Sequence, residues 1–102
     1  MRIEIGNKSY ELRFTVNAMA ELEDMTGQEI GNLLSGGQFK MLRYLMWAGL
    51  IENNPKLTVK AAGALVEEYL QSGGALDALG EALTKAIESA GFFKQAAKAQ
   101  KK

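Results

Sequence analysis

The chain has 102 residues, 12 basic and 12 acidic side chains, a formal net charge of zero and a hydrophobic content of 47%. It contains no histidine and no cysteine, which removes the residue types that supply most general bases, thiolates and zinc ligands, and balanced charge gives no field that draws a protein to nucleic acid or membrane. We therefore expect one soluble domain in a reducing compartment, without a secretory signal, a cofactor, a metal or enzymatic activity.

The N-terminal segment predicts a β-hairpin. Apolar side chains alternate with polar ones along two predicted strands, residues 2–5 and 9–14: Ile3, Ile5, Tyr10, Leu12 and Phe14. The residues between them, Gly6-Asn7-Lys8, suit a tight turn because Gly and Asn adopt positive φ readily. Two strands alone are only marginally stable, so the hairpin is expected to pack on helices.

A first helix is predicted to follow the hairpin. Thr15 can cap its N-terminus, and Gly27 can end it in the left-handed conformation. Its expected apolar face recurs every three residues: Val16, Met19, Leu22 and Met25. A short helical piece over residues 28–34 and a break at residues 35–37 come next.

The segment Phe39–Ile51 is apolar almost all round. Only Lys40, Arg43 and Gly49 interrupt it, and Asn53-Asn54-Pro55 follows as a stop signal. A helix of this kind either lies at the centre of a core or is shared with a partner. The sequence leaves both alternatives open for the helix as a whole.

Two further amphipathic helices are predicted. Thr58 can cap the first, whose apolar face comprises Val59, Ala62, Val66 and Tyr69. The second places Leu76, Leu79, Leu83, Ile87 and Ala90 on one face and stops at Gly91. The expected fold class is α+β, mainly α, with an N-terminal β-hairpin packed on a bundle of about four helices. Residues 1–93 would form the globular domain, and residues 94–102, with four lysines and no acid, a flexible basic tail.

The charged clusters favour neither catalysis nor specific nucleic-acid recognition. The acidic groups at residues 21–24 and 67–68 fall on predicted water-facing stripes, which is typical of solvated helix faces. The tail lysines could touch phosphates, but specific readers usually carry arginine on a basic folded face. A binding or structural protein is therefore the better interpretation.

Four aromatic residues are the candidate partner-binding residues: Tyr44, Trp47, Phe92 and Phe93. Tyr and Trp often anchor protein interfaces, and the methionines near them can adapt to irregular surfaces. The competing interpretation is that these side chains form ordinary core. For Trp47 itself we favour the core, because a domain of this size needs an aromatic centre.

Several short segments, taken in order, carry a resemblance to one known family. They are residues 3–15 (IEIGNKSYELRFT), 20–23 (AELE), 26–27 (TG), 45–50 (LMWAGL), 54–55 (NP), 57–58 (LT), 79–83 (LGEAL) and 90–93 (AGFF). Their order resembles that of the tail assembly chaperones of long-tailed bacteriophages and prophages, over nearly the whole chain. Each segment by itself is only a packing or turn signal, so the resemblance lies in the ordered set.

The resemblance implies a small, mostly helical protein of the bacterial host cytoplasm that is absent from the finished virion. It would bind the aggregation-prone tape measure protein while the tail tube polymerises, with a frameshifted longer form of itself as a second partner. It implies no catalytic residue and no cofactor, and leaves homo-oligomerisation open. Two alternatives remain: a structural tail connector or completion protein retained in the virion, and a DNA-associated regulator that uses the basic tail.

Overall fold

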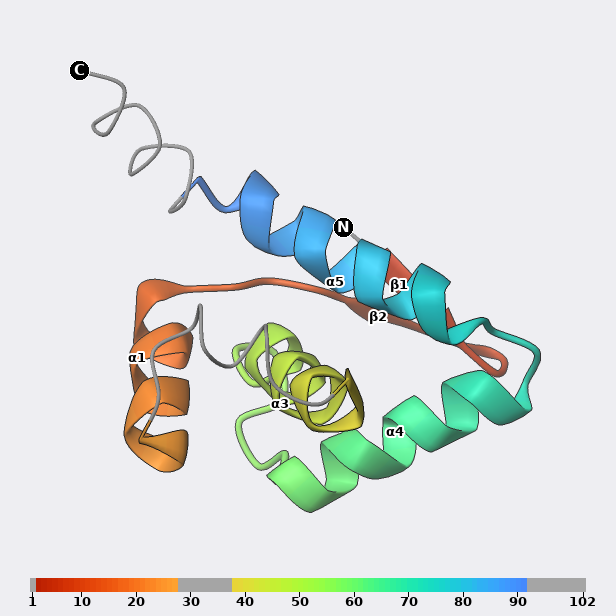
Figure 1. The fold of residues 1–102 in the computed structure, drawn as a ribbon, viewed down its shortest axis with the longest axis horizontal. Helices are drawn as coiled ribbons and strands as arrows, with labels where there is room; N and C mark the ends of the chain where they lie inside the picture. The colour runs from red at the N-terminus through yellow and green to blue at the C-terminus, as the bar shows by residue number, and fades with distance from the viewer. Residues whose placement is uncertain (1, 28–37, 92–102) are drawn as a thin grey trace.

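The computed structural model describes residues 2–27 and 38–91. These ranges form two strands and four helices (Figure 1): β1 (Arg2–Ile5), β2 (Lys8–Glu11), α1 (Val16–Thr26), α3 (Gln38–Leu50), α4 (Val59–Gln71) and α5 (Leu76–Ser89). The α+β, mainly α fold with an N-terminal hairpin is thereby confirmed. The short piece predicted at residues 28–34, Phe92, Phe93 and the tail 94–102 lie outside the described residues.

The hairpin is shorter than the sequence predicts. Ile5 lies opposite Lys8, so the turn comprises two residues, and Gly6 adopts a φ of 63° there. The ladder ends at Glu11, so the predicted extension of the second strand to residue 14 is wrong. Beyond the ladder the chain runs along α3, where Arg13 N–H donates to the Gly49 carbonyl at 2.8 Å.

That extended segment explains the error. Leu12 and Phe14 are both buried, so the alternating pattern of a strand persists although β1 no longer pairs with the chain. Alternating apolar residues therefore indicate an extended segment with one buried side, but they do not show whether that segment pairs in a sheet or packs on a helix.

Both predicted ends of α1 are confirmed. The Thr15 hydroxyl accepts a hydrogen bond from Ala18 N–H at 3.0 Å, and Gly27, at φ 69°, donates its N–H to the Glu23 carbonyl. The predicted apolar face is wrong at its two ends, since Val16 is 65% exposed and Met25 is 45% exposed.

The reason lies in helix geometry. A step of three residues falls short of a full turn by about 60°, so three such steps separate the ends by about 180°. The buried side of α1 consists of Ala18, Met19 and Leu22, a tighter grouping that follows the true helical period.

Helix α3 is the centre of the fold. From Leu42 onwards most of its residues are buried: Leu42, Leu45, Met46, Trp47, Ala48, Gly49 and Leu50. Helices α1, α4 and α5 and strand β2 all contact it, and Figure 1 shows it nearly end-on among them. The central-core alternative therefore holds for this part of α3, because a helix contacted on several sides has little face left for water.

Helices α4 and α5 bury the faces that the sequence predicts. The N-cap of α4 is Thr58, whose hydroxyl accepts from Ala61 N–H at 3.0 Å. Its buried residues are Ala62 and Val66, while α5 buries Leu79, Leu83, Ala86 and Ile87. The two helices cover α3 and complete a core that is continuous with the hairpin.

Candidate partner-binding groove

The predicted partner-binding aromatics do not form one surface in the described part of the chain. Trp47 is 4% exposed, and its Nε1–H donates to the Leu57 carbonyl at 3.0 Å, so it belongs to the core. Tyr44 is half-buried, with the Arg43 guanidinium 5.1 Å from its ring centroid. Phe92 and Phe93 lie outside the described residues, so their predicted role stays a prediction.

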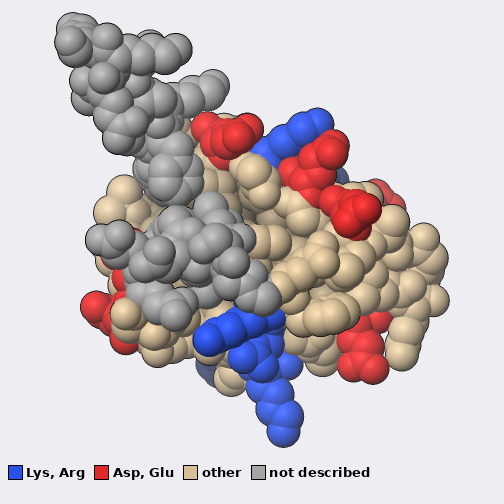
Figure 2. Space-filling view, viewed as in Figure 1, with Lys and Arg blue, Asp and Glu red and all other residues tan. Residues whose placement is uncertain are grey.

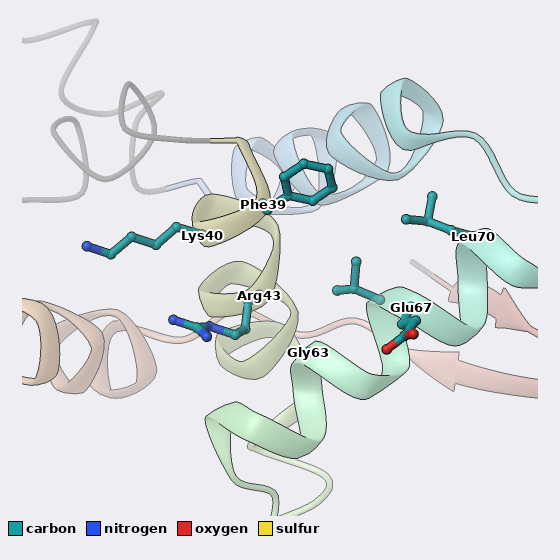
Figure 3. A pocket seen from close by; sticks show the side chains of 7 residues that line it. Phe39, Lys40, Arg43, Gly63, Glu67 and Leu70 are labelled. Carbon is teal, nitrogen blue, oxygen red and sulfur yellow. The ribbon is translucent and has the colours of Figure 1, made fainter.

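An apolar groove lies between α3 and α4 (Figure 3). Its volume is about 420 Å³. The lining residues are Phe39, Lys40 and Arg43 of α3, and Gly63, Val66, Glu67 and Leu70 of α4. We refer to this feature as the α3–α4 groove.

The floor of the α3–α4 groove depends on close approach of the two helices. A Cβ added at Gly63 would lie 3.1 Å from Arg43 Cδ and 3.4 Å from Arg43 Cγ, so the absence of a side chain makes room for the arginine methylenes. Val66 is buried beneath the groove, and Leu70 is half-buried at its far end. The floor is therefore largely hydrocarbon.

Phe39 stands at the upper wall of the groove and is 69% exposed. Val16 and Met25 are the other large hydrophobic side chains with substantial exposure in the described part of the chain, and both lie on α1. An exposed phenylalanine that borders an apolar hollow marks an interaction site more specifically than scattered surface residues do.

The groove carries an uneven distribution of charge. The charged ends of Lys40 and Arg43 extend to the same side, away from Phe39 and Leu70, although the Arg43 methylenes contact α4 at Gly63; Glu67 lies on the α4 wall (Figure 3). Neither basic residue forms an ion pair with any residue in the described ranges. Lys60 lines a neighbouring hollow towards the start of α4. Among the described residues, the α3 edge is thus basic and without an acidic partner.

The space-filling view places this charge in context. Figure 2 shows Lys and Arg side chains gathered below the centre of this face; acidic side chains lie at its left, at its lower right and at its upper edge, where a basic side chain lies among them. The Glu67 carboxylate is approached by the Gln71 amide at 3.5 Å, which is a weak interaction at an exposed site. The molecule has no net charge, but its surface charge is locally segregated.

The sequence marks Phe39 only as part of an apolar helix and does not distinguish it from the buried residues of that helix. In the structure Gln38, Phe39 and Lys40 at the start of α3 are exposed, whereas burial begins at Leu42. One feature of the sequence could have indicated that Phe39 is exposed: it is an apolar residue in the first turn of a helix that directly follows a Gly-Gly break.

Neither a membrane-spanning helix nor a metal-binding cluster occurs in the described ranges. No helix there has the length and apolar character needed to cross a membrane. No cluster of three or more histidine, cysteine, aspartate or glutamate side chains there is arranged to hold a metal ion.

Comparison with protein-family models, with curated proteins and with solved structures found no match to this chain. The resemblance to tail assembly chaperones consequently stays a prediction.

Proposed function

We propose that the protein is a non-catalytic binding protein and, more specifically, a phage tail assembly chaperone that holds the tape measure protein during tail tube assembly. The observation that carries this proposal is the α3–α4 groove, an open apolar hollow bordered by the exposed Phe39. The identity of the client comes from the family resemblance alone.

The energetics of the groove support a binding role. Fully burying a phenylalanine side chain is favourable by roughly 1.5–3 kcal/mol relative to leaving it in water. A partner that covers Phe39 therefore gains binding free energy from this contact. A holding chaperone needs such contact surface and no chemistry, which agrees with a chain that lacks histidine and cysteine. Several copies bound along one extended client would add avidity to weak individual contacts.

Co-expression with the tape measure protein of the same phage or prophage genome tests the proposal. We expect that protein to be soluble and to co-purify with this chain, and to aggregate when expressed alone. A tape measure protein from an unrelated phage is the control for non-specific adhesion. Aggregation in both cases would contradict the chaperone function.

The structural alternative is distinguished by mass spectrometry of purified particles. A chaperone is released, so its peptides should be absent from finished virions. Stoichiometric amounts in the particle would replace the proposal with a connector or completion protein.

A further inference from the structure

We propose that the α3–α4 groove binds a single amphipathic α-helix of the client, with acidic residues along the flank that faces Lys40 and Arg43. This inference rests on the proposed function for the identity of the client. It adds the surface that is used and the kind of segment that is recognised.

The spacing of the lining residues favours a helix. Gly63, Val66, Glu67 and Leu70 follow the i, i+3, i+4, i+7 pattern of one helical stripe, and they extend over about two turns, or roughly 10 Å. A hollow between two such stripes accepts the ridge of a third helix. An occupant of two to three turns with apolar residues at the same spacing would cover Phe39 and Leu70 together.

Extended peptides and strands fit the groove poorly. Both walls are α-helices, whose backbone N–H and C=O groups are already paired within each helix. An extended segment would find no backbone groups to pair with, and its own would be removed from water without compensation. A helix satisfies its backbone internally and brings only side chains to the contact.

The charges determine the orientation of the occupant. The methylenes of Arg43 pack over Gly63 while its guanidinium lies near the Tyr44 ring, so its position at the edge is already constrained. Arg43 and Lys40 have no acidic partner in the described ranges. A carboxylate on the occupant would supply one, and Glu67 favours a basic or neutral residue on the opposite flank.

Neither α1 nor α5 of a second copy matches this occupant. α1 is acidic, but its exposed Val16 and Met25 lie on opposite sides, so it presents no continuous apolar stripe. The outward side of α5 carries Glu81, Lys85 and Glu88, which are exposed. The occupant that we propose is therefore a helix of the client rather than α1 or α5 of another copy.

Fragments that tile the tape measure protein identify the segment, and binding of each fragment is measured by titration calorimetry. We expect Phe39→Asp to weaken the tightest fragment by about tenfold or more, because it places a charge in the apolar contact. Val16→Asp is the matched control, since Val16 is almost as exposed but lies on α1. Both variants should unfold at the wild-type midpoint.

Charge reversal tests the predicted acidic flank. The double variant Lys40→Glu/Arg43→Glu should weaken binding about tenfold and make it less sensitive to salt. Lys8→Glu/Lys56→Glu changes the net charge equally at exposed sites away from the groove and should bind as the wild type does. Lysine substitutions on the acidic flank of the fragment should restore binding to the charge-reversed groove.

The outcomes separate the two proposals. If the wild type binds no fragment and does not co-purify with the full tape measure protein, the proposed function fails and this inference fails with it. If the wild type binds but Phe39→Asp binds equally well, the groove assignment alone is overturned. If Phe39→Asp abolishes binding while charge reversal has no effect, the prediction that the bound helix has an acidic flank is wrong.

Discussion

Two glycines inside helices occupy opposite environments. A Cβ at Gly49 of α3 would lie 2.9 Å from Phe14 Cζ and 3.0 Å from Leu12 Cδ2, both of which are buried in the core. A Cβ at Gly80 of α5 would meet only Leu42 Cδ2, at 3.8 Å, which is an ordinary contact. The same substitution should therefore have opposite effects at the two positions.

We expect Gly49→Ala to lower the free energy of unfolding by about 1–3 kcal/mol, because the core is already filled where the methyl group would lie. Gly80→Ala should raise it by about 0.5–1 kcal/mol, because alanine reduces the entropy of the unfolded chain and favours the helix. Urea denaturation followed by circular dichroism measures both. A neutral or stabilising effect of Gly49→Ala would contradict the packing described for Gly49, and a destabilising effect of Gly80→Ala would contradict the open site described for Gly80.

Trp47, the single tryptophan of the chain, supplies a second test. Replacing it by phenylalanine removes the hydrogen bond to the Leu57 carbonyl and leaves that acceptor short of a donor at a partly buried site. We expect Trp47→Phe to cost about 1–3 kcal/mol in the free energy of unfolding. Tyr44→Phe keeps its ring over Arg43 and should change stability by less than about 0.5 kcal/mol.

Acrylamide quenching of the wild type checks the same feature directly. The indole is almost fully buried, so its fluorescence should be quenched far less than that of the unfolded chain. Equal quenching in the folded and unfolded states would place Trp47 at the surface and return it to the partner-binding set.

At the scale of an element, the orientation of α5 is open to a direct test. Leu83 is fully buried, whereas Lys85, two residues on, is exposed and pairs with Glu81 at 3.3 Å. Leu83→Ala should lower the free energy of unfolding by about 2–5 kcal/mol through lost contacts and a residual cavity. Lys85→Ala should change it by less than about 0.5 kcal/mol, because exposed i, i+4 pairs contribute little. Similar unfolding curves for the two variants would mean that α5 faces the other way.

The ends of elements were predictable from sequence where the signal is local. Thr15 and Thr58 both accept the predicted capping bonds, and Gly27 ends α1 because its left-handed conformation favours a residue without Cβ. The end of β2 was not predictable, because it depends on the bond from Arg13 to Gly49, 36 positions along the chain. Local pattern carries no information about that contact.

The α3–α4 groove could not be predicted from the sequence for a related reason. Its walls come from helices separated by a loop, and the exposure of Phe39 depends on how these helices pack. That this helix is shared with a partner stays a prediction. The sequence pointed to Tyr44 and Trp47, since residue type indicates what can anchor an interface but not which turn of a helix is exposed.

For the whole molecule, the position of α3 determines how the protein should unfold. The described buried residues form one continuous cluster that includes side chains from the hairpin and all four helices. The hairpin also contacts α4, and the Arg13–Gly49 bond ties the segment after β2 to α3. No described element has a separate core on which it could remain folded alone.

We therefore predict a single cooperative unfolding transition. Trp47 fluorescence reports the centre of the core and far-ultraviolet circular dichroism reports the helices, so the two urea curves should coincide. Phe39→Asp is the control, because a side chain that is 69% exposed should not move the common midpoint. Loss of helical signal ahead of the Trp47 transition would contradict the prediction, since it would mean that one helix dissociates from α3 while the centre stays packed.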